Sequence, residues 1–140
     1  MAEISPETLL PAYAQSLGIA LHGYESDLPV LSIEFGGNIE GRPGFLHGGA
    51  TAGLLENAGY AALRTILIEE GRDPVLKPIN ITVQYLSAGK PKTTYALARI
   101  TRLGRRNANL TVEAWQDNRS RLFAQATGHF LMPRREDTNA

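Results

Sequence analysis

The chain has 140 residues, of which 43% are hydrophobic and 20% charged, a composition typical of one globular domain with its own core. Its 14 basic and 14 acidic residues give a formal net charge of zero, so no overall field points to nucleic acid or an anionic membrane as a partner. Because cysteine is absent, a disulfide framework, a thiol nucleophile and a cysteine-ligated metal are excluded, and a cytoplasmic location is favoured.

The N-terminal part predicts a short helix followed by two strands. Ser5 as N-cap and Pro6 at the first helical position predict a helix that ends before Gly18. Residues 19–25 and 30–35 read as strands joined by a turn at residues 26–29, and a loop rich in glycine and proline follows. The acidic start does not resemble a signal peptide, and no stretch is long enough to span a membrane.

A long buried helix is predicted over residues 48–70. Small and apolar residues lie nearly all round its first half, which is typical of a helix inside a protein. Gly71 is placed to end this helix, with Pro74 just beyond it. Gly53 and Gly59 lower helix propensity, so we expect another backbone to approach closely there.

After the helix the hydrophobic period changes to two. Strands are predicted over residues 79–85, 94–103, 108–115 and 124–130. The connections are short, so we expect consecutive strands to be antiparallel neighbours. A curved antiparallel sheet wrapped around one helix fits this pattern, and so do other α+β sandwiches.

The start of the long helix is a candidate oxyanion site. The Gly48 N–H would point at a carbonyl oxygen at the positive end of the helix, and the glycines Gly48 and Gly49 would let the ligand approach. The alternative is a glycine-rich helix entry that His47 merely caps.

Glu56 is a candidate nucleophile or general base within the same helix. Its neighbours Leu54, Leu55 and Ala58 favour burial over the exposed surface position that is usual for glutamate. Asn57 could hold this carboxylate or a substrate group, or could be a solvated helix residue.

The spacing of His47 and Glu56 has a geometric consequence. Nine helical steps turn roughly half a circle and rise about 13 Å, so the two side chains cannot meet at one atom within one subunit. Either they have unrelated roles, or the site forms between two copies of the chain. We favour the dimer.

Basic residues gather at or near two predicted sheet turns. They could hold the phosphates of a nucleotide-bearing substrate, or they could be charged turn residues in contact with solvent. The same two interpretations apply to Arg42. His22 and His129 lie in strand patterns without the spacing of a metal site. The basic residues at these turns are Lys90, Lys92, Arg102, Arg105 and Arg106.

Two segments together resemble the hotdog-fold acyl-CoA thioesterases, and specifically their phenylacetate-pathway-like branch. They are GFLHGGA at residues 44–50, with the acid Glu56 nine positions after His47, and NITVQYL at residues 80–86. The resemblance covers roughly residues 19–132 of a single domain. It implies an α+β hotdog fold, in which the sheet wraps a central helix, and homodimers or dimers of dimers with active sites at the interface.

The resemblance also implies roles for residues. Gly48 N–H would polarise the thioester carbonyl, Glu56 of the other subunit would attack it or activate water, and His47 would orient the substrate or the loop. Coenzyme A would leave as thiolate, as part of the substrate, and no metal or cofactor would be needed. Further substrate-binding candidates are Gly49, Asn57, Arg42, Tyr60, Lys90, Arg105 and Arg106.

The sequence departs from the family pattern at three positions. Many relatives have Asn or Gln where this chain has Gly41, although Asn38 lies nearby, and others use Ser or Thr near Pro78 or at Tyr60. These gaps leave the Gly48/Glu56 pair in place, but they motivate a second hypothesis, a non-catalytic acyl-CoA binding or regulatory protein. A hydratase or dehydratase is less consistent, because the expected Asp/His pair is missing.

Overall fold

The computed structural model describes residues 9–133, so the predicted N-cap at Ser5 and Pro6 lies outside the described part. Helix α2 ends before Gly18, whose φ of 81° suits the glycine predicted to follow the helix. The elements are α2 (Ala12–Ser16), β1 (Ile19–Glu25), β2 (Leu28–Ile33), the 3-10 helix η1 (Gly37–Ile39), α3 (Gly48–Glu69), β3 (Lys77–Tyr85), β4 (Thr94–Leu103), β5 (Asn107–Trp115) and β6 (Leu122–Leu131).

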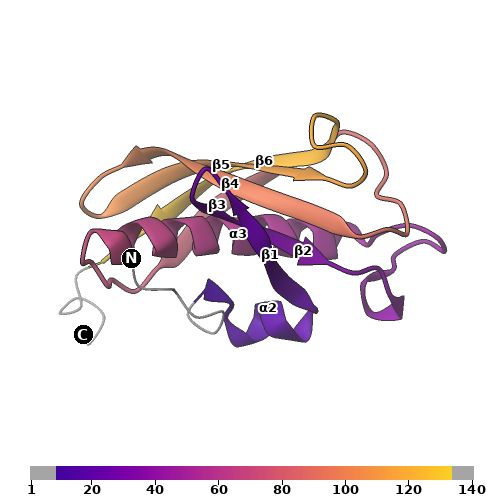
Figure 1. The fold of residues 1–140 in the computed structure, drawn as a ribbon, viewed down its shortest axis with the longest axis horizontal. Helices are drawn as coiled ribbons and strands as arrows, with labels where there is room; N and C mark the ends of the chain where they lie inside the picture. The colour runs from indigo at the N-terminus through magenta and orange to yellow at the C-terminus, as the bar shows by residue number, and fades with distance from the viewer. Residues whose placement is uncertain (1–8, 134–140) are drawn as a thin grey trace.

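Six antiparallel strands form one sheet in the order β1-β2-β4-β5-β6-β3, and this sheet curves over α3 (Figure 1). This is the hotdog fold that the resemblance implied. Within residues 9–133, no helix is long and apolar enough to cross a membrane.

The predicted pairing of β3 with β4 is wrong. β3 lies at the edge beside β6, whereas β4 lies between β2 and β5. The linker between Tyr85 and Thr94 has eight residues, which can reach about 26 Å, and three strand spacings amount to only about 14 Å. The connection is therefore long enough to cross two strands.

The turn between β1 and β2 is shorter than predicted. Ser26 and Asp27 have φ values of 52° and 65°, as in the two-residue turns that match the twist of a hairpin. Leu28 and Pro29 therefore belong to β2, which ends at Ile33.

The core lies between α3 and the concave face of the sheet. Leu54, Leu55, Leu63 and Leu67 are fully buried there, and α3 packs chiefly on β4, β2 and β5. The glycines of α3 are approached by side chains and not by a backbone, which corrects the prediction. A Cβ at Gly53 would lie 3.0 Å from Leu17, and one at Gly59 would lie 3.0 Å from Leu110.

The edge strand β3 leaves apolar side chains exposed. Ile81, Val83 and Tyr85 lie opposite buried residues of β6, so they lie on the concave face of the sheet, where Ile81 and Val83 are half-buried. The main contacts of α3 do not extend to β3, and Tyr85 is 54% exposed. This chain alone therefore leaves part of its concave face uncovered.

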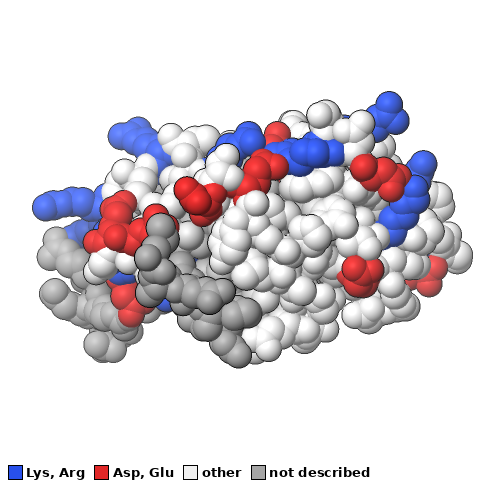
Figure 2. All heavy atoms as spheres, viewed as in Figure 1, with Lys and Arg blue, Asp and Glu red and all other residues white. Residues whose placement is uncertain are grey.

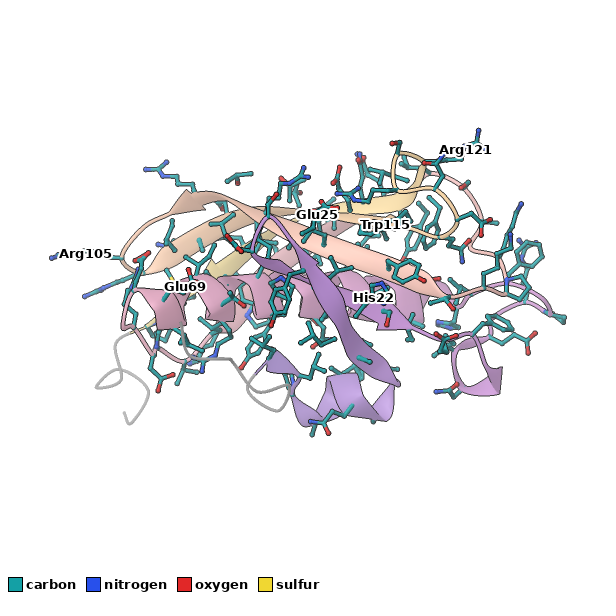
Figure 3. All side chains as sticks on the ribbon, viewed as in Figure 1. His22, Glu25, Glu69, Arg105, Trp115 and Arg121 are labelled. Carbon is teal, nitrogen blue, oxygen red and sulfur yellow. The ribbon has the colours of Figure 1, made fainter. Side chains whose placement is uncertain are left out.

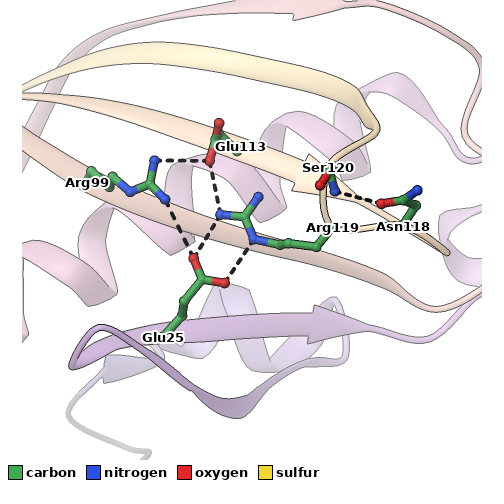
Figure 4. Close-up of polar contacts among 6 residues, drawn as sticks. All are labelled: Glu25, Arg99, Glu113, Asn118, Arg119 and Ser120. Carbon is green, nitrogen blue, oxygen red and sulfur yellow. Dashed lines mark hydrogen bonds and ion pairs between the residues drawn. The ribbon is translucent and has the colours of Figure 1, made fainter.

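A four-residue ion-pair network joins three strands and a turn on the convex face of the sheet (Figure 4). Arg119 donates two hydrogen bonds to the Glu25 carboxylate, at 3.0 and 2.9 Å, and one to Glu113 at 3.1 Å. The hydrogen bond from Arg119, supported by its charge and that of Arg99, lowers the pKa of Glu25, although partial desolvation opposes this. The same bond to Glu25 raises the pKa of Arg119.

Candidate active site

His47 caps the start of α3 by engaging the Gly49 N–H, and the neighbouring Gly48 N–H stays free among the described residues. Its Nδ1 accepts a hydrogen bond of 2.8 Å from the Gly49 N–H, so the ring of neutral His47 carries its proton on Nε2. Within residues 9–133, the Gly48 N–H has no hydrogen-bond acceptor. An unpaired N–H at the first position of a long helix is suited to bind a carbonyl oxygen or an anion.

The loop before α3 is fixed by backbone hydrogen bonds from both sides. The His47 N–H donates to the Ile39 carbonyl at 2.8 Å, and the Leu46 N–H donates to the Gly89 carbonyl at 3.0 Å. The Tyr85 hydroxyl donates to the Gly48 carbonyl at 2.8 Å. The end of β3 and the linker after it therefore set the position of Gly48.

A pocket of about 440 Å³ opens at this helix start. Its lining combines several small residues with the rings of Phe45, Tyr85 and Phe123, which add apolar surface. Such a mixture suits a small-molecule ligand that needs few polar contacts. The lining also includes Gly41, Arg42, Leu46, His47, Gly48, Thr51, Ser87, Ala88 and Gly89.

Glu56 lies eight residues after Gly48, about 12 Å further along α3. It is half-buried in the single chain and not fully buried as its neighbours suggested. Ala52 and Tyr60, one turn to either side, are also half-buried, although most of α3 is buried. The helix is continuous over this span, so Glu56 and the Gly48 N–H of one chain do not meet.

The side chains beside Glu56 are packed into the fold. Asn57 is only 7% exposed and its Nδ2 donates to the Gly53 carbonyl at 2.8 Å, so the alternative of a solvated helix residue is wrong. Tyr60 packs against the hydrophobic core.

The predicted basic residues are divided between two ends of the molecule. Arg42 lies over the Phe45 ring at 4.5 Å in the pocket wall, and Lys90 follows the wall residue Gly89. Arg105 and Arg106 lie in the turn after β4, where Arg72 donates to the Arg105 carbonyl at 2.8 Å. Figure 3 shows Arg105 at the same end of the molecule as Glu69, the last residue of α3, which is the end opposite to Gly48.

The departures from the family pattern have a structural basis at Gly41. A Cβ at Gly41 would lie 3.0 Å from the His47 Cα, so a larger residue would displace the helix start. Asn38 lies in η1 and does not line the pocket. Pro78 lies on the exposed edge strand β3. Within the described residues, no group of three or more His, Asp or Glu side chains could hold a metal ion.

Sequence reasoning missed two pocket residues. Tyr85 appeared only as a strand residue, and Phe123 lies at the start of β6, far from Gly48 in sequence. An aromatic residue at the end of a strand was the only available signal for Tyr85. Nothing in the local sequence indicates that Phe123 reaches this pocket.

Solved structures with the same fold come from several bacteria. A Shewanella oneidensis protein related to the thioesterase superfamily is 22% identical, with 91% of this chain and 92% of that chain covered and a TM-score of 0.77. A Chromobacterium violaceum protein is 30% identical, with coverage of 88% and 84% and a TM-score of 0.66. A phenylacetic acid degradation-related protein from Ralstonia eutropha is 19% identical, with coverage of 88% and 91% and a TM-score of 0.72.

A comparison with curated proteins finds no match. Residues 43–122, more than half of the 140, match the Thioesterase superfamily, and this stretch contains the His47 cap, the unpaired Gly48 N–H and Glu56. The chain therefore belongs to the thioesterase superfamily.

Proposed function

We propose that the protein hydrolyses an acyl-CoA thioester to a free acid and coenzyme A. The observation that carries the proposal is the unpaired Gly48 N–H at the start of a 22-residue helix, facing a pocket of about 440 Å³. A thioester carbonyl placed there would accept this hydrogen bond at the positive end of the helix. Its oxygen gains negative charge as the carbonyl carbon is attacked, so the contact strengthens in the transition state.

The proposed site is completed by Glu56 of the partner subunit. Antiparallel pairing of two β3 edges would cover the exposed apolar side chains of both strands. It would also reverse the direction of the partner's helix, so that the middle of that helix approaches the start of this one. The supporting observation is that Glu56 and Gly48 of one chain stand about 12 Å apart along α3. A homodimer, or a dimer of dimers, is therefore the proposed assembly.

The chemistry needs only water besides the substrate. As general base, the carboxylate removes a proton from water while the water oxygen bonds to the carbonyl carbon. The carbon–sulfur bond then breaks, the electron pair leaves with sulfur, and the thiolate takes up a proton. As nucleophile, the carboxylate would bond to the carbonyl carbon itself, the carbon–sulfur bond would break with release of the thiolate, and water would then hydrolyse the resulting anhydride.

The other candidates have positioning and binding roles in this proposal. His47 keeps the helix start in place by engaging the Gly49 N–H, which leaves Gly48 for the substrate. Asn57 and Tyr60 flank the carboxylate within α3. Arg42 and Lys90 of one chain, or Arg105 and Arg106 from a partner's turn, are the proposed contacts to the charged part of coenzyme A.

We place the protein in the phenylacetate-pathway-like branch, with an aryl or medium-chain acyl group as substrate. The GFLHGGA segment and the likeness in fold to the Ralstonia eutropha protein support this assignment. Gly53, Ala58 and Gly59 are packed in the core of this chain, so Tyr60 is the remaining candidate from α3 for a contact with the acyl group.

The proposal is tested by Glu56→Gln, which keeps the size of the side chain and removes its basicity. Thiol release from a panel of aryl, short-chain and medium-chain acyl-CoAs should fall by about 10²-fold or more. Thermal stabilisation by coenzyme A should persist, because the pocket at Gly48 is unchanged. Hydrolysis by the variant at the wild-type rate would contradict the proposed mechanism.

A non-catalytic acyl-CoA binding protein is the second candidate. It is favoured by the absence of a polar side chain at Gly41, beside His47. Thermal stabilisation of the wild-type protein by the same panel without any thiol release would support this candidate over the enzyme.

A further inference from the structure

A second pocket, of about 410 Å³, adjoins the pocket at the start of α3. Both pockets are lined by Ser87, Ala88 and Phe123, so one extended ligand can occupy both without crossing the protein interior. The second pocket is otherwise built from the linker after β3 and the turn between β5 and β6. These segments contribute Lys90, Gln116, Asp117, Asn118 and Arg121.

The charges around this second pocket leave two cations available. The Asp117 carboxylate is 2.6 Å from the Lys92 ammonium group, which balances its charge. Within residues 9–133, neither Lys90 nor Arg121 forms an ion pair, and both are exposed. An anionic ligand in this pocket would therefore meet two positive charges that no carboxylate of the described residues balances.

The backbone of Lys90 is held in place by a side-chain clamp. The Gln116 Oε1 accepts from the Lys90 N–H at 3.1 Å, and its Nε2 donates to the Lys90 carbonyl at 2.9 Å. The same Nε2 donates to the Thr94 hydroxyl at 2.9 Å, at the start of β4. The linker that carries Lys90 is therefore tied to β4 and β5, which reduces the entropy lost when its cation binds a ligand.

We propose that this second pocket binds the phosphate groups of coenzyme A, with Lys90 and Arg121 of one chain as the cations that hold them. The inference rests on the proposed function, which places the thioester in the adjoining pocket at Gly48. The pantetheine arm would run past Ser87 and Ala88, beside the Phe123 ring. Arg121 presents a planar fork of donors to phosphate oxygens, and Lys90 adds a point charge.

The alternative phosphate site, at Arg105 and Arg106, is far from this pocket within one chain. Figure 3 shows Arg121 toward one end of the molecule, and Arg105 toward the other end, where Glu69 also lies. The 22 residues of α3 span about 33 Å between those ends. Only the partner's turn could bring arginines from that position to the Gly48 pocket, so the two sites can be distinguished by mutation.

The experiment compares two substrates with the same acyl group, acyl-CoA and acyl-pantetheine, of which only the first carries phosphates. For Lys90→Gln/Arg121→Gln, the ratio of kcat/KM for acyl-CoA to kcat/KM for acyl-pantetheine should fall about tenfold or more. The single variant Arg121→Gln is also compared with Arg102→Gln. Arg102→Gln removes one exposed charge on β4, so it controls for the loss of a single positive charge. Adenosine 3′,5′-bisphosphate binding, measured by calorimetry, should weaken in the double variant and be unchanged in the control.

The outcomes separate the two proposals. An unchanged ratio and unchanged binding in the Lys90/Arg121 variant would overturn the second pocket, and a selective loss in Arg105→Gln/Arg106→Gln would move the phosphates to the partner's turn. If the wild-type protein hydrolyses neither substrate, the proposed function fails, while the calorimetric measurement still decides whether this pocket binds the nucleotide.

Discussion

Two adjacent backbone donors have different fates at the start of α3. The Gly49 N–H is engaged by His47 Nδ1, and the Gly48 N–H has no acceptor within the described residues. A histidine cap thus stabilises the helix and still leaves the Gly48 N–H for a ligand. The two readings of the HGG motif, helix cap and ligand site, are compatible with each other.

Gly48→Pro tests the importance of the single N–H. Proline is favoured at the first position of a helix, and His47 already has the extended conformation (φ −67°, ψ 133°) that precedes proline. The variant should fold and lose thiol release by about 10²-fold or more, as when one oxyanion donor is removed. Circular dichroism and a thiol-release assay are the measurements.

Gly48→Ala is the matched control, because it adds bulk but keeps the N–H. Its Cβ would lie 3.5 Å from the Tyr85 hydroxyl, which is an ordinary contact. If the proline variant kept the activity of the alanine variant, the N–H would not stabilise the transition state.

Residue type and helix geometry allow the sequence to propose single candidate residues, but not the residues that surround them. The candidates Gly48 and Glu56 followed from helix geometry and residue type. Tyr85 and Phe123 could not be assigned to the pocket, because their approach to Gly48 depends on how β3 and β6 lie in the sheet. A contact between distant strands has no local signature.

At the scale of elements, the period of the hydrophobic pattern predicted the strands and α3 within a few residues. The order of strands in the sheet was harder to predict, because β3 and β4 follow each other in sequence but are not neighbours in the sheet. An eight-residue linker permits either a hairpin or a crossover, and burial decides between them. β4 is buried over much of its length, whereas β3 is exposed and lies at the edge.

The ion-pair network links β1, β4, β5 and the turn after β5, and its effect depends on pH. The pKa of Glu25 is lowered from 4.5 in the folded protein, so the unfolded chain binds this proton first as the pH falls. The stability that this carboxylate contributes is therefore present above pH 4.5 and lost as the pH falls through the lowered value.

Glu25→Gln should be less stable than the wild-type protein at pH 7, and the difference should shrink as the pH falls below about 4. The free energy of unfolding is measured with urea at pH 7 and at pH 3. Glu69→Gln removes an exposed carboxylate that has no ion-pair partner within residues 9–133, and it should lose no stability. A Glu25→Gln deficit of the same size at pH 7 and pH 3 would contradict this account.

At the scale of the whole molecule, charge and apolar surface have different distributions. On the face shown in Figure 2, positive and negative side chains alternate along the sheet and do not form one large patch of a single sign. The exposed apolar side chains of β3, Ile79 and Tyr85, in contrast, lie along one edge of the sheet, and Tyr85 also lines the Gly48 pocket. This arrangement favours association with a second copy over binding to a highly charged partner.

The central claim is that one active site takes Gly48 from one chain and Glu56 from the other. It is tested most directly by mixing Gly48→Pro and Glu56→Gln chains, each inactive alone, and measuring thiol release after co-refolding. Each mixed dimer would contain one intact site, so the account predicts about a quarter of wild-type activity from an equal mixture. If the site lay within one chain, no dimer would contain an intact site, and a mixture as inactive as its two components would contradict the account.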